Sequence, residues 1–102
     1  MTNEKLQIAT EILNQLGGKM FTMMTGSKNF VIVNNGLRMQ LTRNKSKAKY
    51  FTVTLNAMDV YELEFANYNK QLEKTVSIKY ENVYCDQLKN IFTEVTGLYT
   101  RF

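Results

Sequence analysis

The 102-residue sequence contains no histidine, no proline and no tryptophan, and its one cysteine is Cys85. Because histidine is the commonest general base and metal ligand, its absence excludes Cys-His and Ser-His nucleophile pairs and weakens the case for a metal site. One cysteine forms no intrachain disulfide and builds no zinc site, and at the boundary of an element it is usually a buried packing residue. The sequence therefore predicts a protein that is not an enzyme, with no catalytic residues, no metal and no cofactor.

Long apolar runs are also missing. Residues 1–18 read MTNEKLQIATEILNQLGG and place Glu4, Lys5 and Glu11 among the apolar residues, unlike a signal peptide or a membrane-spanning helix. We expect a cytoplasmic protein without a membrane partner. The length, an apolar fraction of 44% and the absence of a linker-like segment match one folded domain over residues 1–102.

The two ends of the chain show the three- and four-residue spacing of amphipathic helices. The spaced residues are Leu6, Ala9, Leu13 and Leu16 at one end, and Leu88, Ile91, Phe92 and Val95 at the other. Gly17 and Gly18 follow the first pattern, as glycines at helix C-termini do. We expect Asp86 to cap the start of the second helix and Gly97 to cap its end.

Between these helices apolar and polar residues alternate, as in strands that bury one face. We expect five or six strands, in the runs KMFTMM, KNFVIV, LRMQL, YFTVTL, VYELEF and KTVSIKY. Asn34-Asn35-Gly36 is typical of a tight hairpin, because Asn and Gly tolerate a positive φ. Gly26-Ser27-Lys28 is expected to form a turn between two strands.

This order of elements predicts an α+β fold, with an antiparallel five- or six-stranded sheet meander and N- and C-terminal helices packed on one face. The expected inner face of the sheet consists of Phe30, Ile32, Leu37, Met39, Leu41, Phe51, Val53, Leu55, Tyr61, Leu63, Phe65, Val76, Ile78 and Tyr80. The expected core adds Leu13, Leu16, Ile91, Phe92 and Val95 from the helices. The opposite sheet face would remain polar and open.

Acidic residues are absent from residues 12–58, although the whole chain carries a net charge of only +4. This segment contains Lys19, Lys28, Arg38, Arg43, Lys45, Lys47 and Lys49. Residues 59–102 contain more acidic than basic residues. The charge is therefore unevenly distributed, and an asymmetric surface of this kind attracts phosphate backbones or acidic protein patches.

The segment LRMQLTRNKSKAKYF, residues 37–51, concentrates this charge around an expected loop between two strands. Its candidate nucleic-acid-binding residues are Arg38, Arg43, Lys45, Lys47, Lys49 and Tyr50. Cations can hold phosphates, and a tyrosine on an open sheet face can stack on unpaired bases. Lysines in such loops also keep proteins soluble and discourage edge aggregation, so a purely solubilising loop is the alternative.

Glu62 and Glu64 lie two residues apart on one expected strand and would share its outer face. Paired carboxylates at this spacing can serve acid-base chemistry or metal binding. Cross-strand pairing with Lys79 or Arg38 is the simpler interpretation, and we favour it.

Four stretches, TEILNQLGG, MTGSKNF, LNAMDVYELEF and FTEVTGLYT, resemble a family of small uncharacterised proteins encoded by bacteriophages, prophages and other bacterial mobile elements. The resemblance extends over nearly the whole chain. It implies a genetic context and a bacterial host cytoplasm, but no catalytic or binding residues.

Two functional classes agree with these observations. The first is an accessory protein that binds DNA or RNA through its basic loop and sheet face. The second is a small interaction protein that binds an acidic patch on a host or phage protein and inhibits or adapts it, as inhibitors of restriction or CRISPR nucleases do. The sequence leaves the oligomeric state open.

Overall fold

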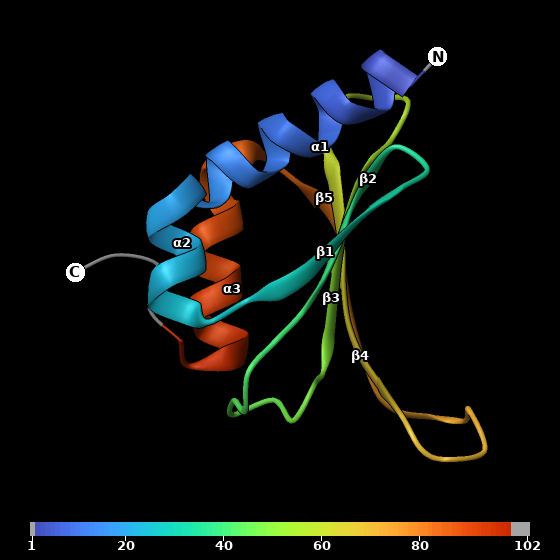
Figure 1. Cartoon of the computed structure of the whole chain (residues 1–102). Helices are drawn as coiled ribbons and strands as arrows, with labels where there is room; N and C mark the ends of the chain where they lie inside the picture. The colour runs from blue at the N-terminus through green and yellow to red at the C-terminus, as the bar shows by residue number, and fades with distance from the viewer. Residues whose placement is uncertain (1, 99–102) are drawn as a thin grey trace.

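The computed structural model describes residues 2–98 and contains three α-helices, five strands and one short 3₁₀ segment (Figure 1). Their bounds are α1 Thr2–Leu16, α2 Gly18–Thr25, β1 Lys28–Val33, β2 Gly36–Gln40, β3 Tyr50–Leu55, β4 Tyr61–Tyr68, β5 Lys74–Val83, η1 Cys85–Gln87 and α3 Leu88–Thr96.

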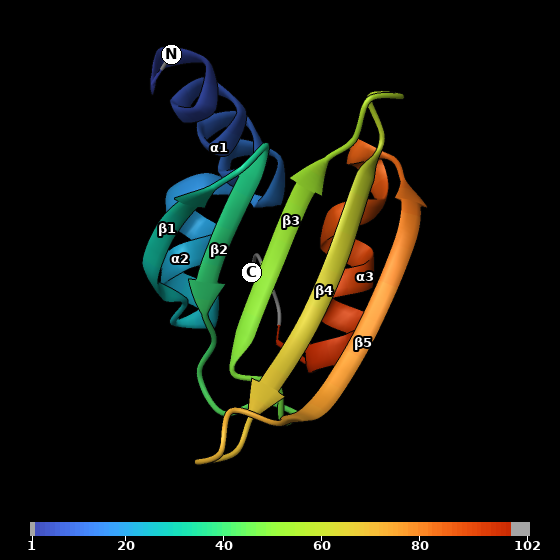
Figure 2. The ribbon, with the colours of Figure 1, turned by 90° about the vertical axis from the view of Figure 1, so that its right-hand side faces the viewer.

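The strands form an open antiparallel meander in the order β1-β2-β3-β4-β5. All three α-helices lie on one face of this sheet, and the other face is uncovered (Figures 1 and 2). The predicted α+β class and the placement of the terminal helices are therefore confirmed. Among the described residues the number of strands is five, the lower of the two expected values.

The expected strand KMFTMM is wrong, because Gly18–Thr25 forms the helix α2. Phe21 and Thr25, four residues apart, are both buried, and the Thr25 hydroxyl donates to the Phe21 carbonyl at 2.7 Å. Gly17, at φ 125°, lies between α1 and α2 and lets the chain turn at this point. The expected turn at Gly26-Ser27-Lys28 is also wrong, since Gly26 is the left-handed C-cap of α2 and Lys28 begins β1.

The core lies between the sheet and the helices. Phe21, Phe51, Phe65 and Phe92 are fully buried, and the rings of Phe51 and Phe65 stack at 4.5 Å. Phe92 of α3 packs against Phe21 at 5.0 Å and Phe51 at 5.2 Å, so one ring joins both helical ends of the chain to the sheet. The expected core residues Leu13, Ile78, Ile91 and Val95 pack at the border of this cluster and are only partly buried.

The caps of α3 are partly as expected. Gly97 has the left-handed conformation, φ 76°, and donates its backbone N–H to the Thr93 carbonyl, which confirms the predicted C-cap. Asp86 does not cap the start, because it lies inside η1 and Gln87 is the N-cap residue. The Gln87 side chain instead accepts the Tyr84 backbone N–H at 2.8 Å.

The edge strands contain irregularities that the sequence pattern did not predict, one in β1 and two in β5, of which the second lies opposite Asn67 and Tyr68. The pairing register shifts between Lys28 and Val31 in β1 and opposite Tyr61 and Leu63 in β5, where Asn29 (φ 55°) and Asn82 (φ 56°) are left-handed. The predicted hairpin at Asn34-Asn35-Gly36 is confirmed, with Val33 opposite Gly36 and Asn35 at φ 60°.

The other three strand connections all contain the same five-residue turn. The turns are Asn44–Ala48, Asn56–Val60 and Asn69–Glu73. In each, the asparagine Oδ1 accepts the N–H of the third residue, and its carbonyl accepts the N–H of the fourth. The fourth residue is left-handed in every case: Lys47 at φ 65°, Asp59 at φ 60° and Leu72 at φ 63°. This recurrence shows that the asparagine, and not the charge of the loop, specifies the turn.

Among residues 2–98, no helix has the length and apolar character required to cross a membrane.

Candidate nucleic-acid interface

The loop between β2 and β3 alternates between residues that face solvent and residues that face the protein. Arg43, Lys45, Lys47 and Lys49 are exposed, whereas Asn44, Ser46 and Ala48 between them are partly or fully buried. This alternation resembles that of a strand with one buried face, and we call the face formed by Asn44, Ser46 and Ala48 the anchored side. Its basic side chains all remain on the outer side.

Asn44 organises the anchored side of this loop. Its Nδ2 donates to the carbonyls of Thr42, at 2.7 Å, and Ala48, at 2.8 Å. Its Oδ1 accepts the backbone N–H of Ser46 at 3.1 Å and the Ser46 hydroxyl, and that hydroxyl accepts the Ala48 N–H at 3.1 Å. The loop conformation is therefore specified by neutral polar groups, which leaves the four cations available for other contacts.

The first half of the loop is attached to the C-terminal ends of two helices. The Thr42 hydroxyl donates to the Thr25 carbonyl at the end of α2, at 2.8 Å. The Lys45 backbone N–H donates to the Thr96 carbonyl at the end of α3, at 2.9 Å. Positive charge near helix C-termini is favourable because of the helix dipole, and this half of the loop carries Arg43 and Lys45.

The second half of the loop continues onto the open face of the sheet. There Arg38 of β2 stacks over the ring of Tyr50, with its guanidinium carbon 4.8 Å from the ring centroid, and the Lys49 amine lies 5.9 Å from the same centroid. Tyr68 of β4 lies beside Tyr50, with ring centroids 6.0 Å apart and an interplanar angle of 56°. Two cations and two aromatic rings therefore meet at one place.

These side chains border a hollow of about 400 Å³ between the β2–β3 loop and the β4–β5 loop. We call this cavity the Tyr50 hollow. It is lined by Arg38, Lys49, Tyr50, Asn67, Tyr68, Asn69 and Leu72. The Asn67 amide donates to the Lys47 carbonyl at 3.0 Å and the Lys49 N–H donates to the Ala66 carbonyl at 3.0 Å, so both bonds hold the loop against β4. The hollow is thus formed by hydrogen-bonded elements.

The structure brings together only some of the six predicted site residues. Arg38, Lys49 and Tyr50 line the hollow. Lys47 lies next to it through its carbonyl bond to Asn67. Arg43 and Lys45 belong to the half of the loop that meets the helix ends, so the predicted set divides into a sheet-face group and a helix-end group.

Sequence reasoning missed Asn67, Tyr68, Asn69 and Leu72. They lie between the expected strands VYELEF and KTVSIKY, and nothing in the local pattern placed them near Tyr50. The missing signal is the strand register: Tyr50 pairs with Ala66, which puts Tyr68 two residues further along the same face.

The carboxylates of β4 form structural contacts. Glu64 lies opposite Lys79 in the register, but its ion pair is with Lys74, at 2.5 Å, so the expected partners Lys79 and Arg38 are wrong for this bond. The hydrogen bond from Lys74 to Glu64 raises the pKa of the Lys74 amine. Glu62 accepts a long hydrogen bond from the Asn56 amide, at 3.4 Å. Neither glutamate needs a metal to explain its position.

The charge is separated along the strands. The end of the sheet that carries the β2–β3 and β4–β5 loops, the loop end, has Lys28, Arg43, Lys45, Lys47, Lys49, Lys70 and Lys74. Its acidic residues are Glu73, Glu94 near the end of α3, and Glu64, which pairs with Lys74. The opposite end, the turn end, has Asp59 in the β3–β4 turn, Glu62 at the start of β4, Glu81 near the end of β5 and Asp86 in η1, with Lys89 at the start of α3. The N-terminal part of α1, whose sequence includes Glu4 and Lys5, lies toward the same end (Figures 1 and 2). The Tyr50 hollow lies at the basic end.

Two titratable side chains near the turn end have an unexpected property: the exposure of Cys85 and the raised pKa of Tyr61. Cys85 is exposed, so the expectation of a buried packing cysteine is wrong. Burial raises the pKa of the Tyr61 hydroxyl above its ordinary value of 10.0, and the nearby Glu11 carboxylate adds to the rise. Among residues 2–98, no group of three His, Cys, Asp or Glu side chains is arranged to hold a metal ion.

No protein-family model, no curated protein and no solved structure matches the chain. Its function therefore has to be inferred from its own residues and their geometry.

Proposed function

We propose that this protein is a non-enzymatic accessory protein of a bacteriophage or bacterial mobile element and binds nucleic acid through the Tyr50 hollow and the adjoining basic loop. The observation that carries the proposal is the grouping of Arg38, Lys49, Tyr50 and Tyr68 at the basic end of an open sheet face.

Each of these groups has a part in the proposed contact. Arg38 and Lys49 bind phosphate oxygens, and Lys47, exposed on the adjoining loop, extends the same positive surface. Tyr50 and Tyr68 offer aromatic rings to unstacked bases, a contact worth about 1–3 kcal/mol per base in single-strand binding proteins. Because bases in a duplex are already stacked, single strands should bind more tightly than duplexes of the same length.

The test is a titration of a labelled oligonucleotide, single-stranded and duplex, at several salt concentrations. The affinity of the wild-type protein should fall linearly on a log-log plot as salt rises, because each phosphate contact releases counterions. Replacing Arg43, Lys45 and Lys47 together with Glu should weaken binding, by the loss of the Lys47 phosphate contact and by the repulsion of the new carboxylates. The lost Lys47 contact should flatten this slope by roughly 0.7 on single strands and roughly 0.9 on duplex DNA. Circular dichroism should show an unchanged fold, because these side chains are exposed.

A protein partner with an acidic patch is the second candidate. Leu72, 82% exposed beside the same cations, favours it, since an apolar side chain next to positive charge suits a protein surface better than a phosphate backbone. Absence of salt-dependent binding to any nucleic acid at low ionic strength would reject the first proposal. In that case the loop is a protein contact or a solubilising loop.

A further inference from the structure

The irregularity in β1 places an asparagine side chain against a glutamine of β2. Between Lys28 and Val31, β1 has one residue more than the paired segment of β2, so β1 contains a bulge. Asn29, inside the bulge, has a left-handed φ of 55°, a conformation that asparagine tolerates better than most residues. Its Nδ2 donates to the Gln40 Oε1 at 2.7 Å on the exposed surface. The bulge thus brings two amide side chains together, and we call Asn29 and Gln40 the amide pair.

The amide pair lies next to Tyr50 in the sheet. Gln40 is the register partner of Tyr50, so the Cβ atoms of the two residues lie about 4.5–5.5 Å apart on the same face. Arg38, two residues before Gln40 in β2, shares this face, and its guanidinium carbon lies 4.8 Å from the Tyr50 ring centroid. A base that stacks at Tyr50 would therefore have its edge within reach of the amide pair.

The amide pair retains hydrogen-bonding capacity for a ligand. The bond between the two side chains uses one N–H of Asn29 and the carbonyl oxygen of Gln40. Among residues 2–98, neither the Gln40 Nε2 nor the Asn29 Oδ1 has a hydrogen-bond partner. The pair therefore offers a donor and an acceptor, which a ligand with the complementary pattern can satisfy in place of water.

The charge of the open face favours a phosphate backbone on the side of the amide pair. Over β3, β4 and β5 a second hollow is lined by three carboxylates and one cation: Glu62, Glu64, Glu81 and Lys79. Even with Lys74 paired to Glu64, this part of the face has no excess of positive charge and does not attract phosphates. Lys28, in contrast, lies opposite Gln40, which lies opposite Tyr50. A single strand that leaves the Tyr50 hollow toward Lys28 therefore passes the amide pair.

We propose that the amide pair contacts the edge of a base stacked at Tyr50 and favours adenine. This proposal rests on the proposed function, because it names the base that the same site prefers. Adenine presents its N6 amino donor beside a ring-nitrogen acceptor, N7 on the Hoogsteen edge and N1 on the Watson–Crick edge. The Asn29 Oδ1 accepts from the amino group, and the Gln40 Nε2 donates to the ring nitrogen.

The other bases match the amide pair less well. On the Hoogsteen edge guanine presents two acceptors, cytosine an amino donor without an adjacent acceptor, and thymine an acceptor beside a methyl group. None of these patterns satisfies both the free donor of Gln40 and the free acceptor of Asn29. Adenine is therefore the base that satisfies the pair on either edge.

Titrations of short adenine and thymine oligonucleotides of equal length test this preference, because both carry the same phosphate charge. Gln40→Met keeps the length of the side chain and removes its polar groups, so it should lower the ratio of adenine affinity to thymine affinity by about fivefold or more. Asn29→Gly should lower the same ratio, because glycine keeps the left-handed bulge without the amide. Self-stacking of adenine affects every protein equally, so a change in this ratio reports a contact to the base.

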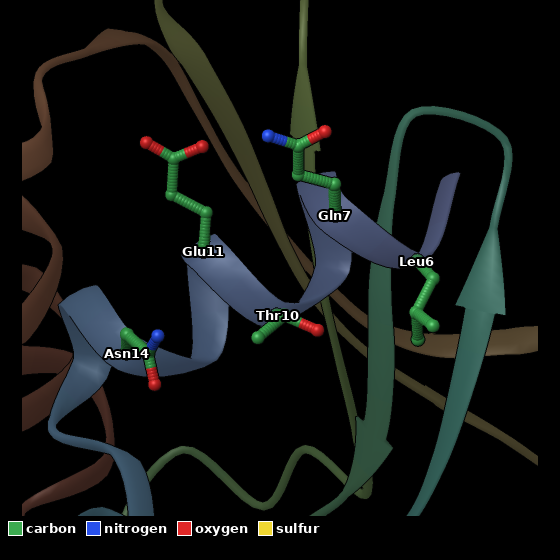
Figure 3. Close-up of a pocket in the computed structure, with 5 residues that line it drawn as sticks. All are labelled: Leu6, Gln7, Thr10, Glu11 and Asn14. Atoms are coloured by element: carbon green, nitrogen blue, oxygen red, sulfur yellow. The ribbon is translucent and has the colours of Figure 1, made fainter. Parts of the chain in front are cut away.

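Gln7→Met is the matched control. Gln7 lies on α1, on the helix side of the sheet, and its side chain points away from the β1–β2 hairpin (Figure 3). The control should have the wild-type ratio, and all three variants should keep the wild-type salt dependence, because none of them removes a cation.

Two outcomes would overturn the proposal, and they are distinguishable. Salt-dependent binding by the wild type, with an unchanged or raised ratio in Gln40→Met or Asn29→Gly and a normal circular dichroism spectrum, would reject the base contact and leave the proposed function standing. Absence of salt-dependent binding by the wild type would reject both.

Discussion

The two loops that border the Tyr50 hollow have the same turn but different charges. Asn44–Ala48 carries Lys45, Ser46 and Lys47 inside its turn, whereas Asn69–Glu73 carries Lys70, Gln71 and Leu72. The third turn of this kind, Asn56–Val60, has Ala57, Met58 and Asp59 in the same places. The backbone therefore requires the asparagine and a left-handed fourth residue and leaves the charges unconstrained. Lysines are not needed to form the β2–β3 loop.

The two turns also differ in what they contact. The Asn44 turn is attached to α3 through the Lys45 backbone and to β4 through Asn67, so its outer side is held in place. The Asn69 turn forms its side-chain bonds within itself, including the bond from Asn69 to the Glu73 carboxylate. The basic β2–β3 loop is therefore held by bonds to other elements, whereas the Asn69 turn is held by bonds within itself.

The largest expected effect comes from removing the asparagine of each turn. Asn44→Ala should lower the free energy of unfolding by about 2 kcal/mol, because the carbonyls of Thr42 and Ala48 and the Ser46 hydroxyl lose a partner in a partly buried place. Asn69→Ala should cost about 1 kcal/mol, since water can replace its exposed bonds. Urea unfolding of both variants measures the difference, and equal losses would show that the two turns are not distinguished by their anchoring.

A smaller effect is expected at the left-handed residue of each turn. Lys47→Gly and Leu72→Gly should each stabilise the protein by about 0.5–1 kcal/mol, because a left-handed conformation costs a residue with a Cβ about 1–2 kcal/mol, partly offset by the greater flexibility of glycine when unfolded. Gln71→Gly is the control and should destabilise. Thermal unfolding distinguishes these cases, and a loss of stability at both Lys47 and Leu72 would contradict the shared turn.

These turns also show how far the sequence determines the fold. The hairpin at Asn34-Asn35-Gly36, the helix end at Gly97 and the alternation of β2, β3 and β4 were predictable, because local conformational preference and burial agree there. The helix α2 was not, because KMFTMM is too short and too uniformly apolar to separate a strand period from a helix period. Burial of Phe21 and Thr25, which decides the question, depends on tertiary packing.

The candidate site was predictable to a similar extent. Arg38, Lys49 and Tyr50 were identified because they are close in sequence, whereas Tyr68 and Leu72 come from strands and turns that only the register brings near. The sequence predicted that Arg43, Lys45, Lys47 and Lys49 lie in or beside a loop between two strands, but it did not predict the attachment of Lys45 to α3. A local sequence pattern does not show which distant strands pair, and this pairing places Tyr68 and Leu72 near Tyr50.

The smallest expected effect concerns the turn at the other end of the sheet. Asn56–Val60 leads into Tyr61, a buried residue whose pKa is raised by burial and by Glu11. Above about pH 10 the unfolded chain loses the Tyr61 proton before the folded chain does, so the free energy of unfolding should fall as pH rises. Tyr61→Phe should make this decline shallower. Urea unfolding of both proteins between about pH 8 and about pH 11 measures it, and parallel curves would contradict the assignment.

The central claim, that the Tyr50 hollow binds nucleic acid, is tested most directly by two double variants that remove equal charge. Arg38→Gln with Lys49→Gln removes the cations of the hollow, and Arg43→Gln with Lys45→Gln removes those at the helix ends. In a single-strand titration at low salt, the first pair should weaken affinity by about tenfold or more, because phosphate contacts and the positioning of Tyr50 are lost together. The second pair should cost about twofold to threefold, the effect of distant charge alone. Equal losses in the two variants, or a larger loss in the helix-end pair, would contradict the claim.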